Sequence, residues 1–154
     1  MGKDIHVRII KKDRNTNTWK QIKLYHKEKG KFKLVNVYPF RSYELFDILS
    51  GNDEKYNAYS ICLNDLPNNL KQEVERCKNT IGYYNFFEIN LADLKLYLQR
   101  VPKVKDYDSE KENAWKNNPV KYFVERIEQY IDFVDSSWDL YPYSDVKILY
   151  WFDC

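Results

Sequence analysis

Three residues near the two ends of the chain carry side chains suited to acid–base chemistry or to metal binding: Asp4, His6 and Asp153. An imidazole and a carboxylate can act as a base with its orienting partner, or as ligands of a metal ion. A catalytic zinc normally takes three protein ligands, and His26 is the only other histidine of the chain. The residues therefore leave two interpretations open, a small hydrolase and a structural hydrogen-bonded cluster, and they favour the structural one.

Two strands are needed to bring these residues together. Residues 1–12 and 146–154 are rich in β-branched and aromatic side chains, which suit a half-buried pleated surface. Side chains alternate between the faces of a strand, so Trp151 and Asp153 share one face. If the two strands pair in one sheet, we expect that face to hold the aspartate and histidine of the first strand as well. Trp151 is then a candidate binding residue beside them.

The whole chain, residues 1–154, predicts a single domain of the α+β class. Strand-like segments at 19–24 and 32–37 follow the first strand, with turn residues at 27–31 between them, and predict an antiparallel meander. We expect an antiparallel sheet of four to five strands with both terminal strands in its interior and one face covered by three to four helices. Further expectations are a short strand or buried turn at 81–89, a loop at 52–67 and an exposed polar loop at 103–118.

Apolar side chains at three- and four-residue steps predict the helices. The strongest pattern covers residues 119–135 and predicts that Phe123, Ile127 and Ile131 are buried against the sheet. Shorter helices are expected at 42–51, 70–79 and 90–101.

A second candidate site lies where the helix at residue 42 begins. Arg41 and Tyr43 flank that start, and the free backbone N–H groups of a helix N-terminus attract anions. A phosphate site is one interpretation; the favoured one is that Arg41 pairs with a carboxylate and Tyr43 packs. The sequence has no phosphate-binding glycine loop, no nucleophile elbow and no zinc-ligand spacing. It therefore predicts no cofactor and no metal, and it favours binding over catalysis.

Charge and aromatic content limit the class of partner. The net charge of +2 argues against direct nucleic-acid binding. Residues 1–33 hold eleven Lys/Arg against three Asp/Glu, a balance of +8, whereas residues 106–154 hold five against eleven, a balance of −6. Aromatic residues make up 17% of the chain, which is typical of a recognition surface or of an AT-rich genome. No long apolar run predicts a membrane segment, and three cysteines without metal-ligand spacing favour a reducing cytoplasm.

Four short blocks resemble a family of small, mostly phage-encoded proteins. The family opens Met-Gly-x-Asp-Ile-His and closes on Val-x-x-x-x-Trp-Phe-Asp, as residues 1–6 and 146–153 do here. Residues 41–51 match its Arg-x-Tyr-x-Leu-Phe-x-x-Leu-x-Gly segment, and a Leu-Pro step follows at 66–67. The family often has a His-Ser step where this chain has Tyr-Asn-Phe at 84–86.

The resemblance implies an accessory protein of phage origin. We expect it to counter a bacterial defence system, in the cytoplasm of the host cell, by binding and blocking a host defence protein without catalysis. Two alternatives stay open: a sponge that sequesters a small nucleotide immune signal, and a metal- or nucleotide-dependent hydrolase. A homodimer is also open. The candidate binding residues are Asp4, His6, Arg41, Tyr43, Trp151 and Asp153.

Overall fold

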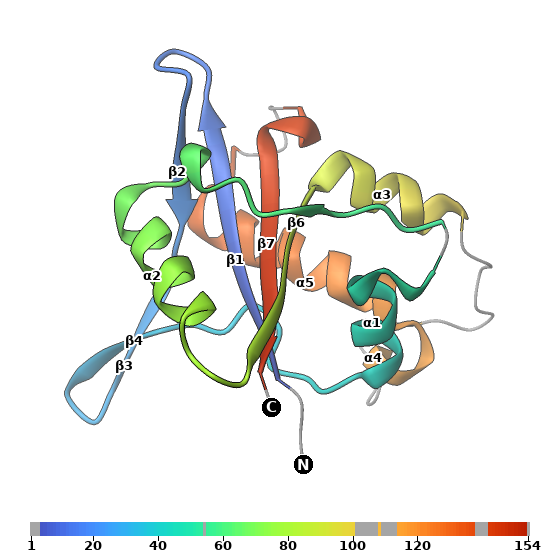
Figure 1. Ribbon diagram of the computed structural model, residues 1–154. Helices are drawn as coiled ribbons and strands as arrows, with labels where there is room; N and C mark the ends of the chain where they lie inside the picture. The colour runs from blue at the N-terminus through green and yellow to red at the C-terminus, as the bar shows by residue number, and fades with distance from the viewer. Residues whose placement is uncertain (1–3, 54, 101–107, 109–113, 138–141, 154) are drawn as a thin grey trace.

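A five-stranded antiparallel sheet forms the centre of the protein. The computed structural model describes residues 4–53, 55–100, 108, 114–137 and 142–153 (Figure 1). The strand order is β2-β1-β7-β6-β5, so the first and last strands are interior strands, as the sequence predicts. The strands are β1 (Asp4–Asp13), β2 (Thr18–Ile22), β5 (Tyr59–Ser60), β6 (Tyr83–Asn90) and β7 (Val146–Asp153).

Three of the described helices begin at a residue whose side chain caps them. The Asn118 side chain accepts a hydrogen bond from the backbone N–H of Lys121, and Asn90 does the same for Asp93. Ser42 caps the short first helix. The helices are α1 (Tyr43–Asp47), α2 (Asn68–Lys78), α3 (Leu91–Arg100), α4 (Ala114–Asn117) and α5 (Pro119–Val134).

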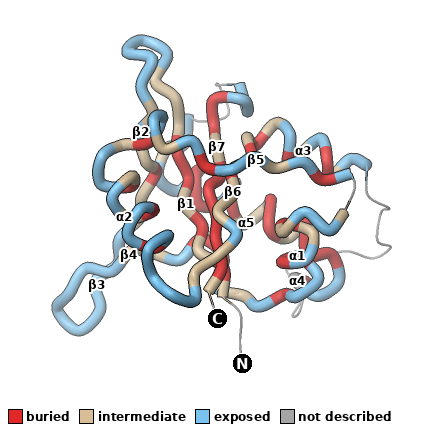
Figure 2. Tube along the Cα trace, viewed as in Figure 1, coloured by how far each residue is buried: buried red, intermediate tan, exposed pale blue. Residues whose placement is uncertain are grey.

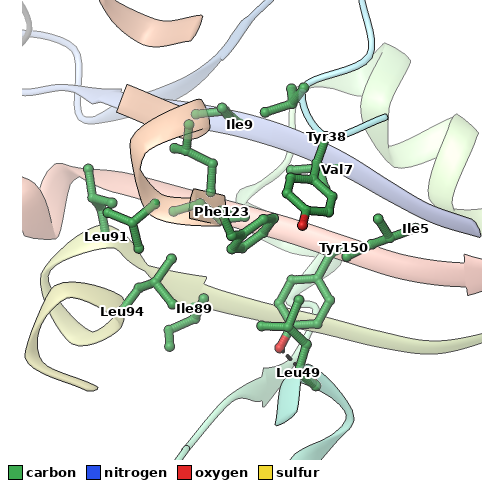
Figure 3. Packing of buried hydrophobic residues seen from close by; sticks show 14 of the residues in the cluster. Ile5, Val7, Ile9, Tyr38, Leu49, Ile89, Leu91, Leu94, Phe123 and Tyr150 are labelled. Atoms are coloured by element: carbon green, nitrogen blue, oxygen red, sulfur yellow. Dashed lines mark hydrogen bonds between the residues drawn. The ribbon is translucent and has the colours of Figure 1, made fainter. Parts of the chain in front are cut away.

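The main hydrophobic core lies between one face of the sheet and helices α1, α3 and α5. The predicted residues of α5 are confirmed there, since Phe123, Ile127 and Ile131 are all fully buried. They pack in one cluster with residues such as Ile9 and Tyr150 of the central strands (Figure 3). The Tyr150 hydroxyl donates to the Leu49 carbonyl oxygen at 2.9 Å, so its polar atom is satisfied inside the core.

A second core lies on the opposite face of the sheet, and it corrects the expectation that helices cover one face only. Helix α2 packs Leu70 and Val74 on this face (Figure 1). Both faces of β7 are apolar, because Leu149 and Trp151 alternate with the residues of the main core and are themselves buried. A strand that is apolar on both faces needs cover on both.

A β-bulge in β6 decides which aromatic side chains face α2. The register with β7 shifts between Tyr84 and Phe87, and Asn85 has a φ of 56°. The extra residue changes the alternation, so Tyr83 and Phe86 pack against the second core whereas Tyr84 and Phe87 pack against the main one.

The predicted meander is wrong in its third strand. Strand β4 (Lys31–Leu34) pairs with β3 (Tyr25–Glu28), part of which was expected to be a turn, and these two strands form a separate sheet. The chain reverses at Lys29 and Gly30, which both have positive φ values, 50° and 78°. A two-residue turn of this kind favours a tight hairpin that pairs with itself. This hairpin projects from the body of the protein (Figures 1 and 2).

Two of the expected loops contain regular structure. Strand β5 and a 3-10 turn at Leu63–Asp65 lie within 52–67. In the expected loop 103–118, Ala114–Asn117 forms α4, and Ala114 is buried; residues 103–107 and 109–113 lie outside the described residues. Across the part of the chain that the structure describes, no helix is long and apolar enough to cross a membrane.

Candidate functional site

The first and last strands bring His6 and Asp153 into direct contact. The Nε2 atom of His6 lies 2.6 Å from Asp153 Oδ2, and because an ionised carboxylate only accepts, the imidazole N–H donates. The two side chains are 28% and 24% exposed. Strand pairing produces this contact: His6 lies opposite Trp151, two residues before Asp153, on the same face of the sheet. The predicted clustering of these residues is therefore confirmed.

Aromatic rings fix the orientation of the His6 imidazole. The ring stacks on Trp151 with centroids 5.9 Å apart and an interplanar angle of 14°. Tyr83 of β6, the strand on the far side of β7, lies at 5.5 Å from the imidazole ring and is tilted by 43°. Trp151 is 1% exposed and also stacks on Phe86, so it is a core residue rather than an accessible binding residue.

An ion pair lies next to the His6–Asp153 contact on the same face of the sheet, closer to the middle of β1. Arg8 Nε donates to Glu73 of α2 at 2.6 Å, and the Arg8 guanidinium lies 5.4 Å from the Trp151 ring centroid. The pair ties β1 to the helix that covers this face. It also places a cation on an aromatic ring, which stabilises both groups.

Asp4 has a different partner from His6. It lies directly opposite Asp153 in the β1–β7 register, where two carboxylates repel each other. Arg41 offsets this repulsion by donating to Asp4 from Nε at 2.7 Å and from Nη2 at 3.4 Å. The hydrogen bond to Asp4, with nearby Tyr43 and Asp153 as smaller causes, raises the pKa of Arg41. The predicted carboxylate partner of Arg41 is thus present, and Tyr43 is 58% exposed rather than packed away.

A cysteine thiol lies on the same face of the sheet, packed in the second core. Cys77 is buried, and burial together with the charge of Glu73 raises the pKa of its thiol, so the reactive thiolate is disfavoured. Among the described residues, no group of three or more His, Cys, Asp or Glu side chains is placed to hold a metal ion. The His6–Asp153 contact joins the side chains of the first and last strands at one end of the sheet.

Two surface hollows lie toward the other end of β1. One, of about 390 Å³, is lined by Lys11, Arg14 and Lys20 among others. The other, of about 600 Å³, is lined by residues that include Lys12, Trp19 and Lys147. Neither hollow is lined by His6 or Asp153, so these open surfaces are separate from the predicted site.

Three further residues surround this site. Arg8 shares the face of His6 by simple alternation, so the sequence alone places it there. Glu73 comes from a helix 65 residues away, and Tyr83 reaches His6 only through the pairing of β6 with β7, so neither could be placed without the fold.

Comparison with known proteins identifies no relative of this chain. No protein-family model matches the chain, and neither a curated protein nor a solved structure matches it.

Proposed function

We propose that this chain is a phage-type accessory protein that binds a host bacterial defence protein in the cytoplasm of the infected cell and blocks it without catalysis. The observation that carries the proposal is the exposure of large apolar side chains on a protein with well-packed cores. Tyr25 is 53% exposed and Phe32 75% exposed, and the two rings share one face of the β3–β4 hairpin. Neighbouring exposed apolar side chains of this kind mark sites of protein contact.

The polar cluster at the end of the sheet supports binding over turnover. Hydrolysis needs a base or a metal-bound water that reaches the substrate. The His6 imidazole is instead stacked on Trp151 and bonded to Asp153, and Asp4 is bonded to Arg41. The hydrolase alternative, built on Asp4, His6 and Asp153, therefore has less support than the binding function.

The sequence supports the phage context. The Met-Gly-Lys-Asp-Ile-His opening and the Trp-Phe-Asp close resemble phage-encoded proteins, and the basic N-terminal third complements an acidic partner. Protein contact requires aromatic anchors with a polar rim, and this chain has 14 tyrosines and four tryptophans.

The hollow of about 600 Å³ favours a second candidate function, the sequestration of a nucleotide signal. Lys12, Trp19 and Lys147 line it, and the Lys147 ammonium lies 4.8 Å from the centroid of the Trp19 ring. Cations and an aromatic ring are the groups that hold phosphate and base. Mass spectrometry of small molecules released by heat from the purified protein tests this alternative: a sponge releases an intact nucleotide that a Trp19→Ala, Lys12→Ala variant no longer retains.

Phage plating on bacteria that each carry one defence system tests the binding function. Expression of the chain should restore plating on at least one such strain, and the same defence protein should co-purify with it. A His6→Asn variant that keeps the fold should still restore plating. Loss of rescue with an unchanged melting temperature would instead support the hydrolase alternative.

A further inference from the structure

The β3–β4 hairpin is exposed over almost its whole length. Every residue of β3 is exposed, and in β4 only Leu34 is half-buried. The hairpin joins the body at its base, where the Leu24 backbone N–H donates to the Tyr130 hydroxyl at 2.8 Å and Val35 N–H donates to the Leu24 carbonyl at 2.7 Å. The rest of the hairpin extends into solvent (Figure 2).

The two faces of the hairpin differ in chemistry. Tyr25 lies opposite Leu34 and Lys27 lies opposite Phe32, so these four side chains share one face. The opposite face pairs His26 with Lys33 and Glu28 with Lys31, and there Glu28 contacts His26 and forms an ion pair with Lys33. One face is therefore mainly apolar and uncovered, and the other is polar and partly neutralised.

An uncovered apolar face has a physical cost. Phe32 is 75% exposed and Tyr25 53% exposed, although burying such rings is among the largest favourable terms available to a protein. A two-stranded hairpin is marginally stable by itself. Docking onto a partner surface removes the two aromatic rings from water and thereby stabilises the hairpin.

The charge around this face identifies the chemistry of the surface it fits. Residues 23–33 contain five lysines and one glutamate, a balance of +4. We propose that the β3–β4 hairpin docks Tyr25 and Phe32 into an apolar cleft of a partner protein whose rim is rich in Asp and Glu. This proposal rests on the proposed function, because it names the surface by which the chain binds its target.

The distribution of charge favours a protein over a nucleic acid. A nucleic-acid surface alternates bases with phosphates, so it needs cations on the same face as the stacking rings. Here the aromatic face carries one lysine, Lys27, while Lys31 and Lys33 lie on the other face beside Glu28. An apolar centre with charge at its rim is instead the usual anatomy of a protein interface. Lysines on these short strands also disfavour strand addition, so the contact is made by side chains.

Site-specific photocrosslinking tests the hairpin. A benzophenone amino acid replaces Phe32 in one variant and, as a matched control, Tyr59 in another, since Tyr59 is 68% exposed on a different strand. The Phe32 position should yield a protein adduct in infected cells, and the crosslinked peptide should contain apolar residues flanked by Asp or Glu. Adducts to nucleic acid, adducts to a second copy of this chain, or equal yields at the two positions would each overturn the proposal.

The affinity of variants for the purified target separates the hairpin proposal from the broader proposal that the chain binds and blocks a defence protein. Tyr25→Ser and Phe32→Ser variants should bind about tenfold or more weakly, as expected for aromatic anchors, whereas Tyr59→Ser stays within about twofold. All three positions are exposed, so the melting temperatures should match. If the hairpin variants still block the target fully, the hairpin assignment fails while the binding function stands. If no variant and not even the unchanged chain blocks a defence protein, the binding function fails.

Discussion

Separating His6 from Asp153 should destabilise the protein without abolishing its function. The perturbation is a double-mutant cycle of His6→Ala and Asp153→Ala. Exposed ion pairs contribute about 0.2–1 kcal/mol, and hydrogen bonds to charged groups about 1.5–3 kcal/mol. The contact here is short, 2.6 Å, and its side chains are only 28% and 24% exposed, so we expect a coupling energy of about 1–2 kcal/mol, between those ranges.

The single His6→Ala change should cost more than the coupling energy alone. It also removes the contacts of the imidazole with Trp151 and Tyr83, and aromatic pairs contribute about 0.5–1.5 kcal/mol each. Urea unfolding at pH 7 measures each free energy of unfolding. The matched stability control is His26→Ala, because the His26–Glu28 contact is longer, 3.4 Å, and half exposed, so its removal should cost less than about 0.5 kcal/mol. A coupling energy near zero, together with loss of phage rescue in both single variants, would refute the structural role of the pair.

Three further predictions concern the fold. Ile127→Ala should cost about 2–5 kcal/mol in urea unfolding because Ile127 is fully buried, whereas Phe133→Ala on the same helix, 78% exposed, should cost under about 0.5 kcal/mol; equal costs would contradict the packing of α5. Tyr150→Phe should cost about 1–3 kcal/mol, since it leaves buried hydrogen-bond partners in the core unsatisfied. The hydrogen bond from Lys11 holds the pKa of Asp135 at about 2, below its unfolded value, so the stability that this carboxylate adds is present above about pH 4 and is lost as the pH falls toward 2. Asp135→Asn should therefore lower stability by about 1 kcal/mol at pH 7, after allowance for solvent screening, and by almost nothing near pH 2, which urea unfolding at the two pH values checks.

The sequence predicts those parts of the fold whose periodicity is strong. The pattern of residues 119–135 locates α5 within one residue, and the alternation in 146–154 identifies β7 and the face that Asp153 shares with Trp151. The apolar character of Leu149 and Trp151 on that second face was also visible, and it explains why α2 covers it.

Other features depend on contacts between distant segments. Residues 27–31 have the composition of a turn, but Lys27 and Glu28 belong to a strand because the positive φ values at Lys29 and Gly30 fold Tyr25–Glu28 onto Lys31–Leu34. The bulge at Asn85 reverses the side-chain alternation of β6, which no periodicity reveals. The contact of His6 with Asp153 and the place of Trp151 beside them were predictable from strand alternation, whereas Tyr83 and Glu73 reach this face through tertiary packing.

Titration of a purified defence protein with this chain tests the central claim, binding without turnover, most directly. The defence protein is the one identified by phage rescue, and its remaining activity is measured at a fixed concentration well above the dissociation constant. Binding predicts a linear fall that ends near one chain, or one dimer, per target and does not change with incubation time. Inhibition that is complete far below one chain per target and that grows with time would mean turnover and would contradict the account.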